Sequence, residues 1–359
     1  MTTADPVAPV AEDPSLNAWK GLVDFDRLTA WMDEKGLETG PIEEAGRPPG
    51  GTQNVLVKFR RGDRWFMLRR PPRHPRMNGS ETMRREARLL AGIANTDVPH
   101  PRLIAACPEE DVLGAAFYLM EPVDGFNPTV GLPPLHAGDP KIRNRMGFAL
   151  VEGIAALGRV DHVAAGLADL GRADGFLERQ VGRWQKQLDS YNEYEGWAGP
   201  AGIPGVHDVA AWLEERRPAT FKPGLIHGDY HLANVLYRYD GPELAAIVDW
   251  ELTTVGDPLL DLGWIMATWP EEGRAEQNVS VTPWDGFPTA PELVERYATM
   301  TDRDMSHMEW YGVLACYKLG IILEGTHARA AAGKAEVETG DSLHAQTVSL
   351  FERALRWIG

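Results

Sequence analysis

The sequence predicts an α+β protein of two lobes, in which a small β-rich N-lobe precedes a large and mainly helical C-lobe. Short apolar strand patterns fill much of the N-terminal third, and helical periodicity dominates from residue 141 onward. One β-like segment, residues 225–250, interrupts the helical part. We therefore expect a flexible tail over residues 1–18, an N-lobe over 19–121 and a C-lobe over 122–359.

The N-lobe is predicted from alternating strand and helix patterns, most of them ended by proline or glycine. The predicted elements are a helix over 24–35, a strand before residue 46, a glycine- and proline-rich turn over 46–54, strands over 55–59 and 65–69, a helix over 81–94, and strands over 102–106 and 115–121.

The C-lobe is predicted from apolar residues at helical spacing on both sides of residues 225–250. The predicted helices cover residues 142–157, 176–191, 209–217, 292–299, 310–330 and 342–358.

Composition and charge exclude several classes of protein. Of the 359 residues, 43% are hydrophobic and 25% are charged, which is ordinary for a globular chain. A net charge of −16 argues against a nucleic-acid partner, because phosphate neutralisation requires clustered Lys and Arg. No apolar run reaches the ~18 residues that span a membrane, and the N-terminus does not resemble a secretory signal. Together with two cysteines, Cys107 and Cys316, expected to be buried free thiols, these features predict a cytoplasmic protein.

Residues 225–250 carry the most informative pattern. Two apolar strands flank a turn at Asp240-Gly-Pro, which predicts a hairpin. Asp229 and Asn234 precede the first strand, and Asp249 ends the second. Because a hairpin returns the chain to its starting end, we expect these three oxygen-bearing side chains to converge.

Phosphoryl transfer requires such a set of side chains. A carboxylate orients and deprotonates the attacking hydroxyl, while a carboxylate and an amide hold the magnesium that bridges the nucleotide phosphates. Asp229 is the predicted base, and Asn234 and Asp249 are the predicted metal ligands. This order of Asp, Asn and Asp is the one that protein kinases use, which predicts a protein-kinase-like fold with ATP and Mg²⁺ as cofactors.

The pattern His227-Gly-Asp229-x4-Asn234, followed by Asp249 on a strand, resembles the aminoglycoside phosphotransferase and choline kinase superfamily. The resemblance implies that His227 holds the catalytic loop through hydrogen bonds. A zinc site is the alternative, because His227 and His231 are four residues apart. Gly228 and the adjacent strand argue against the helix that this spacing would need, and no third soft ligand lies nearby in the sequence.

The N-lobe is expected to supply the phosphate contacts. Gly50, Gly51, Thr52 and Asn54 lie in a turn whose backbone N–H groups could cap phosphates, although a plain hairpin loop would have the same pattern.

Kinases place a cation on the third strand and pair it with a glutamate on the following helix. Arg69 and Glu86 occupy these positions, with a surface ion pair as the alternative interpretation. The strand that ends near Glu121 should lead into the hinge between the lobes. Because Pro122 has no N–H, the adenine donor is predicted to be Glu121 or Val123.

Most of the chain, about residues 40–340, further resembles the kinase-like domain that some proteins fuse to acyl-CoA dehydrogenases. The residues that carry this resemblance are Phe66-Met-Leu-Arg69, Pro71-Pro72, Arg85-Glu86, Val98-Pro-His-Pro101, Gly166-Leu167, Arg179-Gln-Val-x-x-Trp184, Asp249-Trp-Glu251, Gly256-Asp-Pro258 and Ile322-Leu-x-Gly325. In this branch the strand-three cation is itself an Arg. Ala233 stands where many relatives carry Asp.

This second resemblance implies that the phosphorylated hydroxyl belongs to an acyl-CoA or a similar hydroxy acid. The residues also favour a partly apolar or anionic acceptor over an aminoglycoside, because an aminoglycoside is polycationic and would need an acidic pocket. Residues 301–335, the predicted pocket wall, carry both charges and some apolar surface, although a solvated helix face would carry them too. The members of this set are Asp302, Asp304, Glu309, Glu324, Arg303, Lys318, Arg329, Lys334, Tyr311, Tyr317 and Leu323.

Two further carboxylates, Asp257 and Asp261, are expected to hydrogen-bond the catalytic loop and to cap a helix start. The predicted function is Mg²⁺- and ATP-dependent phosphorylation of a small-molecule hydroxyl. The alternatives are an aminoglycoside or macrolide antibiotic kinase and a nucleotide-binding pseudokinase scaffold. The oligomeric state is not indicated.

Overall fold

The computed structural model describes residues 19, 21–47, 55–72, 78–271 and 280–359. The chain divides into two compact units, one comprising Met1–Ala94 with Pro101–Val123 and the other Asn95–His100 with Asp124–Gly359. The predicted lobe boundary at residue 121 lies close to this division. Asn95–His100 was expected in the N-lobe but belongs to the second unit, where Ile247 donates its N–H to the Pro99 carbonyl at 2.9 Å.

The N-terminal unit is built on a five-stranded antiparallel sheet of order β1-β2-β3-β5-β4. Its elements are α2 Phe25–Glu34, β1 Ile42–Gly46, β2 Val55–Arg61, β3 Arg64–Arg70, α3 Gly79–Ile93, β4 Leu103–Cys107 and β5 Phe117–Met120. All seven match a predicted element to within a few residues.

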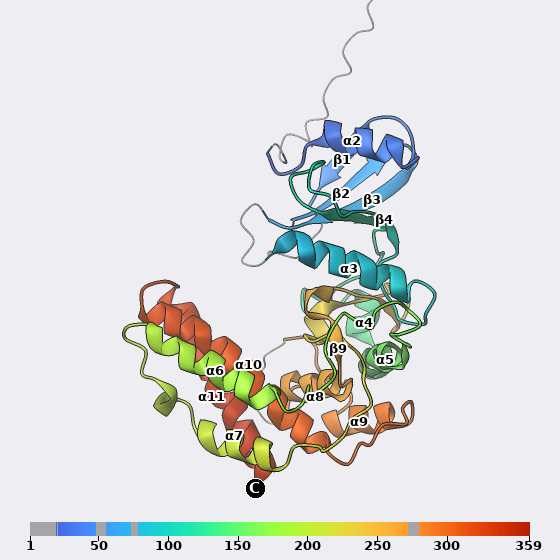
Figure 1. The fold of residues 1–359 in the computed structure, drawn as a ribbon. Coiled ribbons are helices and arrows are strands. Elements are labelled where there is room, and N and C mark those ends of the chain that lie inside the picture. Colours follow the sequence, from blue (N-terminus) through green and yellow to red (C-terminus); the bar gives the residue numbers. More distant parts are fainter. Residues whose placement is uncertain (1–18, 20, 48–54, 73–77, 272–279) are drawn as a thin grey trace, which may run out of the picture. The chain divides into compact units, whose positions relative to one another are not determined.

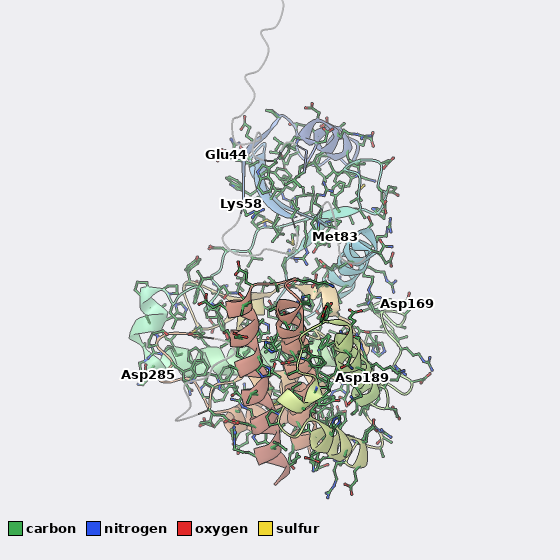
Figure 2. The ribbon with its side chains drawn as sticks, turned by 90° about the vertical axis from the view of Figure 1, so that its left-hand side faces the viewer. Glu44, Lys58, Met83, Asp169, Asp189 and Asp285 are labelled. Carbon is green, nitrogen blue, oxygen red and sulfur yellow. The ribbon has the colours of Figure 1, made fainter. Side chains whose placement is uncertain are left out.

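Strand alternation gives this sheet two faces that different helices cover (Figure 1). Phe59 pairs with Phe66 in the β2–β3 register, and both pack in the core with Trp31 of α2. On the other face Arg69 of β3 reaches Glu86 of α3, the helix on which Met83 is labelled in Figure 2. The sheet therefore separates an apolar core from a face that carries charged groups.

The C-terminal unit is mainly helical. Its elements are α4 Pro134–Gly138, α5 Pro140–Arg159, α6 Gln180–Ser190, α7 Val206–Glu215, β6 Gly224–Ile226, β7 Val235–Tyr237, β8 Leu244–Ile247, β9 Thr254–Gly256, α8 Leu259–Thr268, α9 Ala290–Ala298, α10 Met308–Ala331 and α11 Val337–Ile358. The long helices α10 and α11 lie side by side, with α6 beside them (Figure 1).

Helix α8 is the main element that the sequence pattern did not predict as a helix. Eight of its residues are buried, and its sequence, LLDLGWIMAT, is apolar on all sides. A helix enclosed on every side has no polar face, so it lacks the periodicity by which amphipathic helices are recognised. Only its start was expected, from Asp257 and Asp261.

The expectation for the two cysteines is confirmed. Cys107 and Cys316 are both free and buried. Among the described residues, no helix combines the length and the hydropathy that a membrane crossing requires.

Candidate active site

The predicted catalytic residues lie in the segments that flank the strands of two small antiparallel sheets in the C-terminal unit. β7 pairs with β8 as the predicted hairpin, and β6 pairs with β9. Val248 donates its N–H to the carbonyl of Asn234 at 2.9 Å, so the hairpin ladder brings the residue before Asp249 against Asn234. The expected return of Asp249 to the end of the hairpin that holds Asn234 is confirmed at the level of the backbone.

Asn234 is bound directly to the predicted base. Its side-chain Nδ2 donates to the Asp229 carbonyl at 2.8 Å and to the Asp229 carboxylate oxygen Oδ2 at 3.1 Å. Because the amide nitrogen faces Asp229, the amide oxygen of Asn234 is directed away from it. The amide thus fixes the base on one side and presents a hard oxygen on the other.

Asp249 has a backbone conformation that is uncommon for a residue with a side chain. Its φ and ψ are 65° and 63°, in the left-handed region. Left-handed backbone costs roughly 1–2 kcal/mol for an L-residue other than glycine. Such a cost is tolerated where the surrounding structure imposes a particular side-chain direction, and it occurs often at functional sites.

His227 holds the catalytic loop, as the resemblance implied. The ring is fully buried, its Nε2 lies 2.9 Å from the Val248 carbonyl, and its Nδ1 accepts the N–H of Asp229 at 3.4 Å. These contacts occupy both ring nitrogens. The segment is a loop between β6 and β7, so the helix that a zinc site at His227 and His231 would need is absent here.

The two further carboxylates have the roles expected of them. Asp261 accepts the backbone N–H groups of His227 at 2.6 Å and Gly228 at 2.9 Å. Asp257 accepts the N–H of Leu259, at the start of α8, at 3.1 Å. Gly228 has a φ of +88°, and a Cβ there would lie 2.8 Å from the Leu252 carbonyl, so this turn of the loop requires glycine.

The surroundings of Asp229 keep it ionised. Burial by itself would raise the pKa of this carboxyl, but a hydrogen bond from His231 and the charges of His231, His227 and Lys318 outweigh it and lower the pKa to about 2. His231 Nε2 lies 3.3 Å from Asp229 Oδ1. At neutral pH Asp229 is therefore a carboxylate that can accept a hydrogen bond.

Lys318 is a cation beside the catalytic loop that comes from the middle of α10. Its Nζ donates to the Gly228 carbonyl at 2.8 Å and lies 4.2 Å from the centroid of the Trp264 ring. Burial lowers the pKa of Lys318 to about 8, against the opposing effect of Asp229 and Asp261, which favour its charged form. The ammonium is thus charged at neutral pH and close to losing its proton above it.

A pocket of about 320 Å³ opens beside Asp229 within the C-terminal unit. It is lined by Thr129, Asp229, His231, Ala233, Trp264, Thr268, Ser280, Leu319, Leu323 and Gln346. Of the residues predicted for its wall, Leu323 lines it. Tyr311 and Tyr317 are buried elsewhere in the unit, with hydroxyls bound to Asp257 and Gln185 respectively.

In the N-terminal unit the predicted pair of Arg69 and Glu86 is formed. Two contacts join them, Nη2 to Oε1 at 3.0 Å and Nε to Oε2 at 2.8 Å, and the Tyr118 hydroxyl donates to Oε2 at 2.6 Å. Arg69 is 7% exposed and Glu86 is 2% exposed. The surface ion pair considered as an alternative is therefore wrong. The pair is a buried, two-pronged one.

The other predicted nucleotide contacts are less complete. Gly50, Gly51, Thr52 and Asn54 lie outside the described residues. Glu121 donates its N–H to the Arg102 carbonyl at 2.8 Å within the unit. Since that donor is engaged, Val123 remains the predicted adenine donor.

Three residues of the site were not recognised from the sequence. His231 was considered only for zinc, Lys318 only as one charge of a pocket wall, and Asn127, whose Nδ2 donates to the Ala233 carbonyl at 2.5 Å, not at all. For Lys318 a signal exists, because it is the only charged residue in the run from Trp310 to Leu323. A lone lysine in an apolar helix indicates a specific partner.

The sequence profile of the phosphotransferase enzyme family matches residues 45–296 of the chain. Among curated proteins, mouse acyl-CoA dehydrogenase family member 10 is 28% identical over 332 residues, 89% of this chain and 30% of that protein. Human acyl-CoA dehydrogenase family member 11 is 26% identical over 316 residues, 85% of this chain and 39% of that protein. The chain thus spans 30–39% of the length of these relatives, and the second resemblance is confirmed.

Two solved structures confirm the fold. A protein from Ralstonia eutropha, assigned by name as an aminoglycoside phosphotransferase, is 27% identical with a TM-score of 0.75, covering 93% of this chain and 98% of that one. An aminoglycoside 2″-phosphotransferase solved with GDP and kanamycin is 14% identical with a TM-score of 0.62, covering 93% and 99%. At that identity the second likeness concerns the fold alone.

Proposed function

The chain belongs to the phosphotransferase enzyme family, and from this premise we propose that it transfers the γ-phosphoryl group of ATP to a hydroxyl of a small molecule. The observation that carries the proposal is the placement of Asp229. Its carboxylate is held by Asn234, ionised by neighbouring cations and at the wall of a pocket. A group so placed can orient a hydroxyl that enters the pocket.

Asp229 is the proposed base. The acceptor hydroxyl donates a hydrogen bond to its carboxylate, the hydroxyl oxygen forms a bond to the γ-phosphorus, and the bond from that phosphorus to the β–γ bridging oxygen breaks. The proton passes to Asp229, and ADP leaves. A carboxylate with a pKa of about 2 is a weak base, but phosphoryl transfer proceeds through a loose transition state in which positioning contributes most.

Asn234 and Asp249 are the proposed holders of Mg²⁺. Their amide and carboxylate oxygens are hard ligands of the kind that Mg²⁺ prefers, and the left-handed backbone of Asp249 is consistent with a directed ligand. When bound, the ion neutralises negative charge that develops on the phosphate oxygens. Arg69 and Glu86 are proposed to contribute to nucleotide binding from the N-terminal unit.

The pocket favours an acceptor with little positive charge. Asp229 is the one carboxylate among the described residues that line it, and Trp264, Leu319 and Leu323 supply apolar surface. A polycationic sugar would meet few partners there. Since curated relatives are named acyl-CoA dehydrogenases, we propose a hydroxyacyl-CoA or a hydroxy acid as the acceptor class.

An antibiotic acceptor is the second candidate, because one structural relative was solved with kanamycin and another is assigned by name to aminoglycoside phosphorylation. It shares the chemistry and differs in the pocket that it needs. An acidic lining would favour it, and the lining described above does not have one.

The test is a Mg²⁺-dependent ATP consumption screen of the purified chain over hydroxyacyl-CoAs, hydroxy acids, amino alcohols and aminoglycosides. We expect turnover with a hydroxyacyl-CoA or hydroxy acid, and turnover lowered by about 10²–10⁴-fold in the Asp229→Asn variant. Asp240→Asn, an exposed aspartate in the hairpin turn, is the matched control and should keep full turnover. Undiminished turnover in Asp229→Asn would contradict the proposed base, and turnover with aminoglycosides alone would contradict the acceptor class.

A further inference from the structure

Two helices of the C-terminal unit each present a carboxylate and an imidazole three residues apart. On α10 these are Glu324 and His327, and on α11 they are Asp341 and His344. Residues three apart lie on one face of a helix, and α10 and α11 lie side by side in Figures 1 and 2. The two pairs therefore face each other across the helix contact.

The donor atoms of this cluster are close together. Glu324, His327 and His344 each offer a ligand atom, and these atoms all lie within 4.8 Å of one another. His344 Nδ1 lies 2.7 Å from Glu324 Oε2, and His327 Nδ1 lies 3.5 Å from Asp341 Oδ1. Small side-chain rotations would bring four donors to the separations found around one metal ion.

The negative charge of Glu324 in this cluster has no strong positive partner among the described protein groups. The Glu324 side chain is 1% exposed, and no lysine or arginine among the described residues forms an ion pair with it. A buried carboxylate that lacks a strong positive partner is costly. Trp197 Nε1 donates to its other oxygen, Oε1, at 2.7 Å, which satisfies that oxygen without supplying charge.

The two imidazoles add a second sign of a missing partner. The rings of His327 and His344 stack with centroids 4.4 Å apart and an interplanar angle of 23°. His327 Nδ1 is buried and has no hydrogen-bond partner among the described residues, whereas buried polar atoms are normally satisfied.

We propose that Glu324, His327 and His344 bind a divalent transition metal of the zinc class, with Asp341 as the fourth ligand. Neutral imidazoles with carboxylates are typical zinc ligands, whereas Mg²⁺ prefers oxygen donors, so this ion is distinct from the proposed nucleotide-associated one. A divalent cation supplies the charge that Glu324 lacks and a partner for the unsatisfied ring nitrogen.

The site has a structural consequence for the pocket. Leu319 and Leu323 of α10 and Gln346 of α11 line it, and Leu323 directly precedes Glu324. A metal that joins the two helices would fix these lining residues relative to one another. Four protein ligands leave no open position, which is typical of a structural site and not a catalytic one.

The experiment titrates ZnCl₂ into the chelator-treated full chain in the absence of nucleotide, with calorimetry for stoichiometry and the melting temperature as a second readout. We expect one ion per chain and a melting temperature that rises with zinc concentration, because the ion binds the native state preferentially. Co²⁺ should give the intense visible absorption of a four-coordinate site. MgCl₂ should not substitute.

His327→Ala and His344→Ala should each weaken zinc binding at least about tenfold. The matched control is His307→Ala, which removes an exposed histidine just before α10. Asp249→Asn and His231→Ala test the catalytic loop as the source of binding and should keep the zinc response. Equal loss in His307→Ala or in either loop variant would overturn the proposal, as would a wild-type chain that shows no heat and no shift.

Circular dichroism establishes that each alanine variant is folded before titration. Should His344→Ala fail to fold, Asp341→Asn carries the test, because this residue is 65% exposed and its loss should lower the affinity without affecting the fold. Unchanged zinc affinity in both Asp341→Asn and His327→Ala would leave the stacked histidines as an ordinary polar network and end the proposal.

Discussion

Asp229 lies in the loop between β6 and β7, and Asp261 of α8 binds the backbone of the same loop. Their surroundings shift the pKa of the same functional group in opposite directions. Burial raises the pKa of Asp261, and the charge of His227 and two backbone N–H groups reduce that rise without reversing it. Burial acts in the same sense on Asp229, but His231, His227 and Lys318 reverse it and lower the pKa to about 2.

The difference separates a carboxylate that positions the loop from one that can act on a substrate. Asp261 is buried, and its two carboxylate oxygens accept hydrogen bonds from the backbone N–H groups of His227 and Gly228. Asp229 borders the pocket, and Asn234 and His231 hold it from within the loop. Opposite shifts in neighbouring acids indicate distinct roles, here a fixed support and a reactive group.

The largest effect is expected from Asp229→Asn. Loss of a positioned base typically lowers kcat by about 10²–10⁴-fold. KM for ATP should change little, because the amide keeps the shape of the carboxyl group. The urea unfolding midpoint should fall only modestly, because the side chain is partly exposed and solvent screens the interactions that lower its pKa. Steady-state kinetics with the acceptor from the screen checks this, and a large loss of stability would place Asp229 with Asp261 as a structural group.

Asp261→Ala should give the reverse pattern. Two buried backbone N–H groups lose their acceptor, and unsatisfied groups cost about 1–3 kcal/mol each, so the free energy of unfolding should fall by about 2–6 kcal/mol. Urea denaturation checks this value. Asp240→Ala, at an exposed turn residue, is the control and should lie within about 0.5 kcal/mol of wild type. Equal stability of the Asp261 and Asp240 variants would contradict the supporting role.

Lys318→Met tests the cation that both carboxylates share. The folded-state pKa of Lys318, about 8, is lower than its ordinary value of 10.5, so the unfolded chain binds this proton more tightly. The stability that Lys318 contributes is therefore fully present above pH 10.5 and decreases as the pH falls through about 8. As the pH rises from about 8 to 10.5, the unfolding free energy of wild type should therefore increase relative to that of Lys318→Met. A pH-independent difference would show that the ammonium is not buried beside the loop.

The smallest effect is expected from His231→Ala. Removing this hydrogen bond and charge should raise the pKa of Asp229 from about 2 toward its ordinary value of 3.8. A lowered pKa contributes stability that is present above the ordinary value and is lost as the pH falls through the folded one. In the variant this contribution should therefore be smaller, and its acid loss should be complete at a higher pH. Carboxyl NMR titration measures the pKa, with His307→Ala as a control that should not move it.

More of the N-terminal unit than of the C-terminal unit could be predicted from the sequence, and the difference follows from burial. Every strand and helix described in the N-terminal unit was expected, because its sheet has one face in an apolar core and its strands show the corresponding alternation. In the C-terminal unit the buried helix α8 and the pairing of β6 with β9 were not expected. Both lie where the chain is enclosed on all sides, and burial removes the periodicity that marks an element.

By itself the sequence predicted the two-part α+β organisation, the proposed catalytic set of Asp229, Asn234 and Asp249, and phosphotransferase chemistry, because these follow from local periodicity and from short fixed spacings. Only the tertiary structure decided that Lys318, which is 90 positions from Gly228, supports the loop, and that Glu324, His327 and His344 form one cluster. The reason is that helix packing sets which long-range neighbours meet, and single-chain periodicity specifies the face of a helix but not the partner across it.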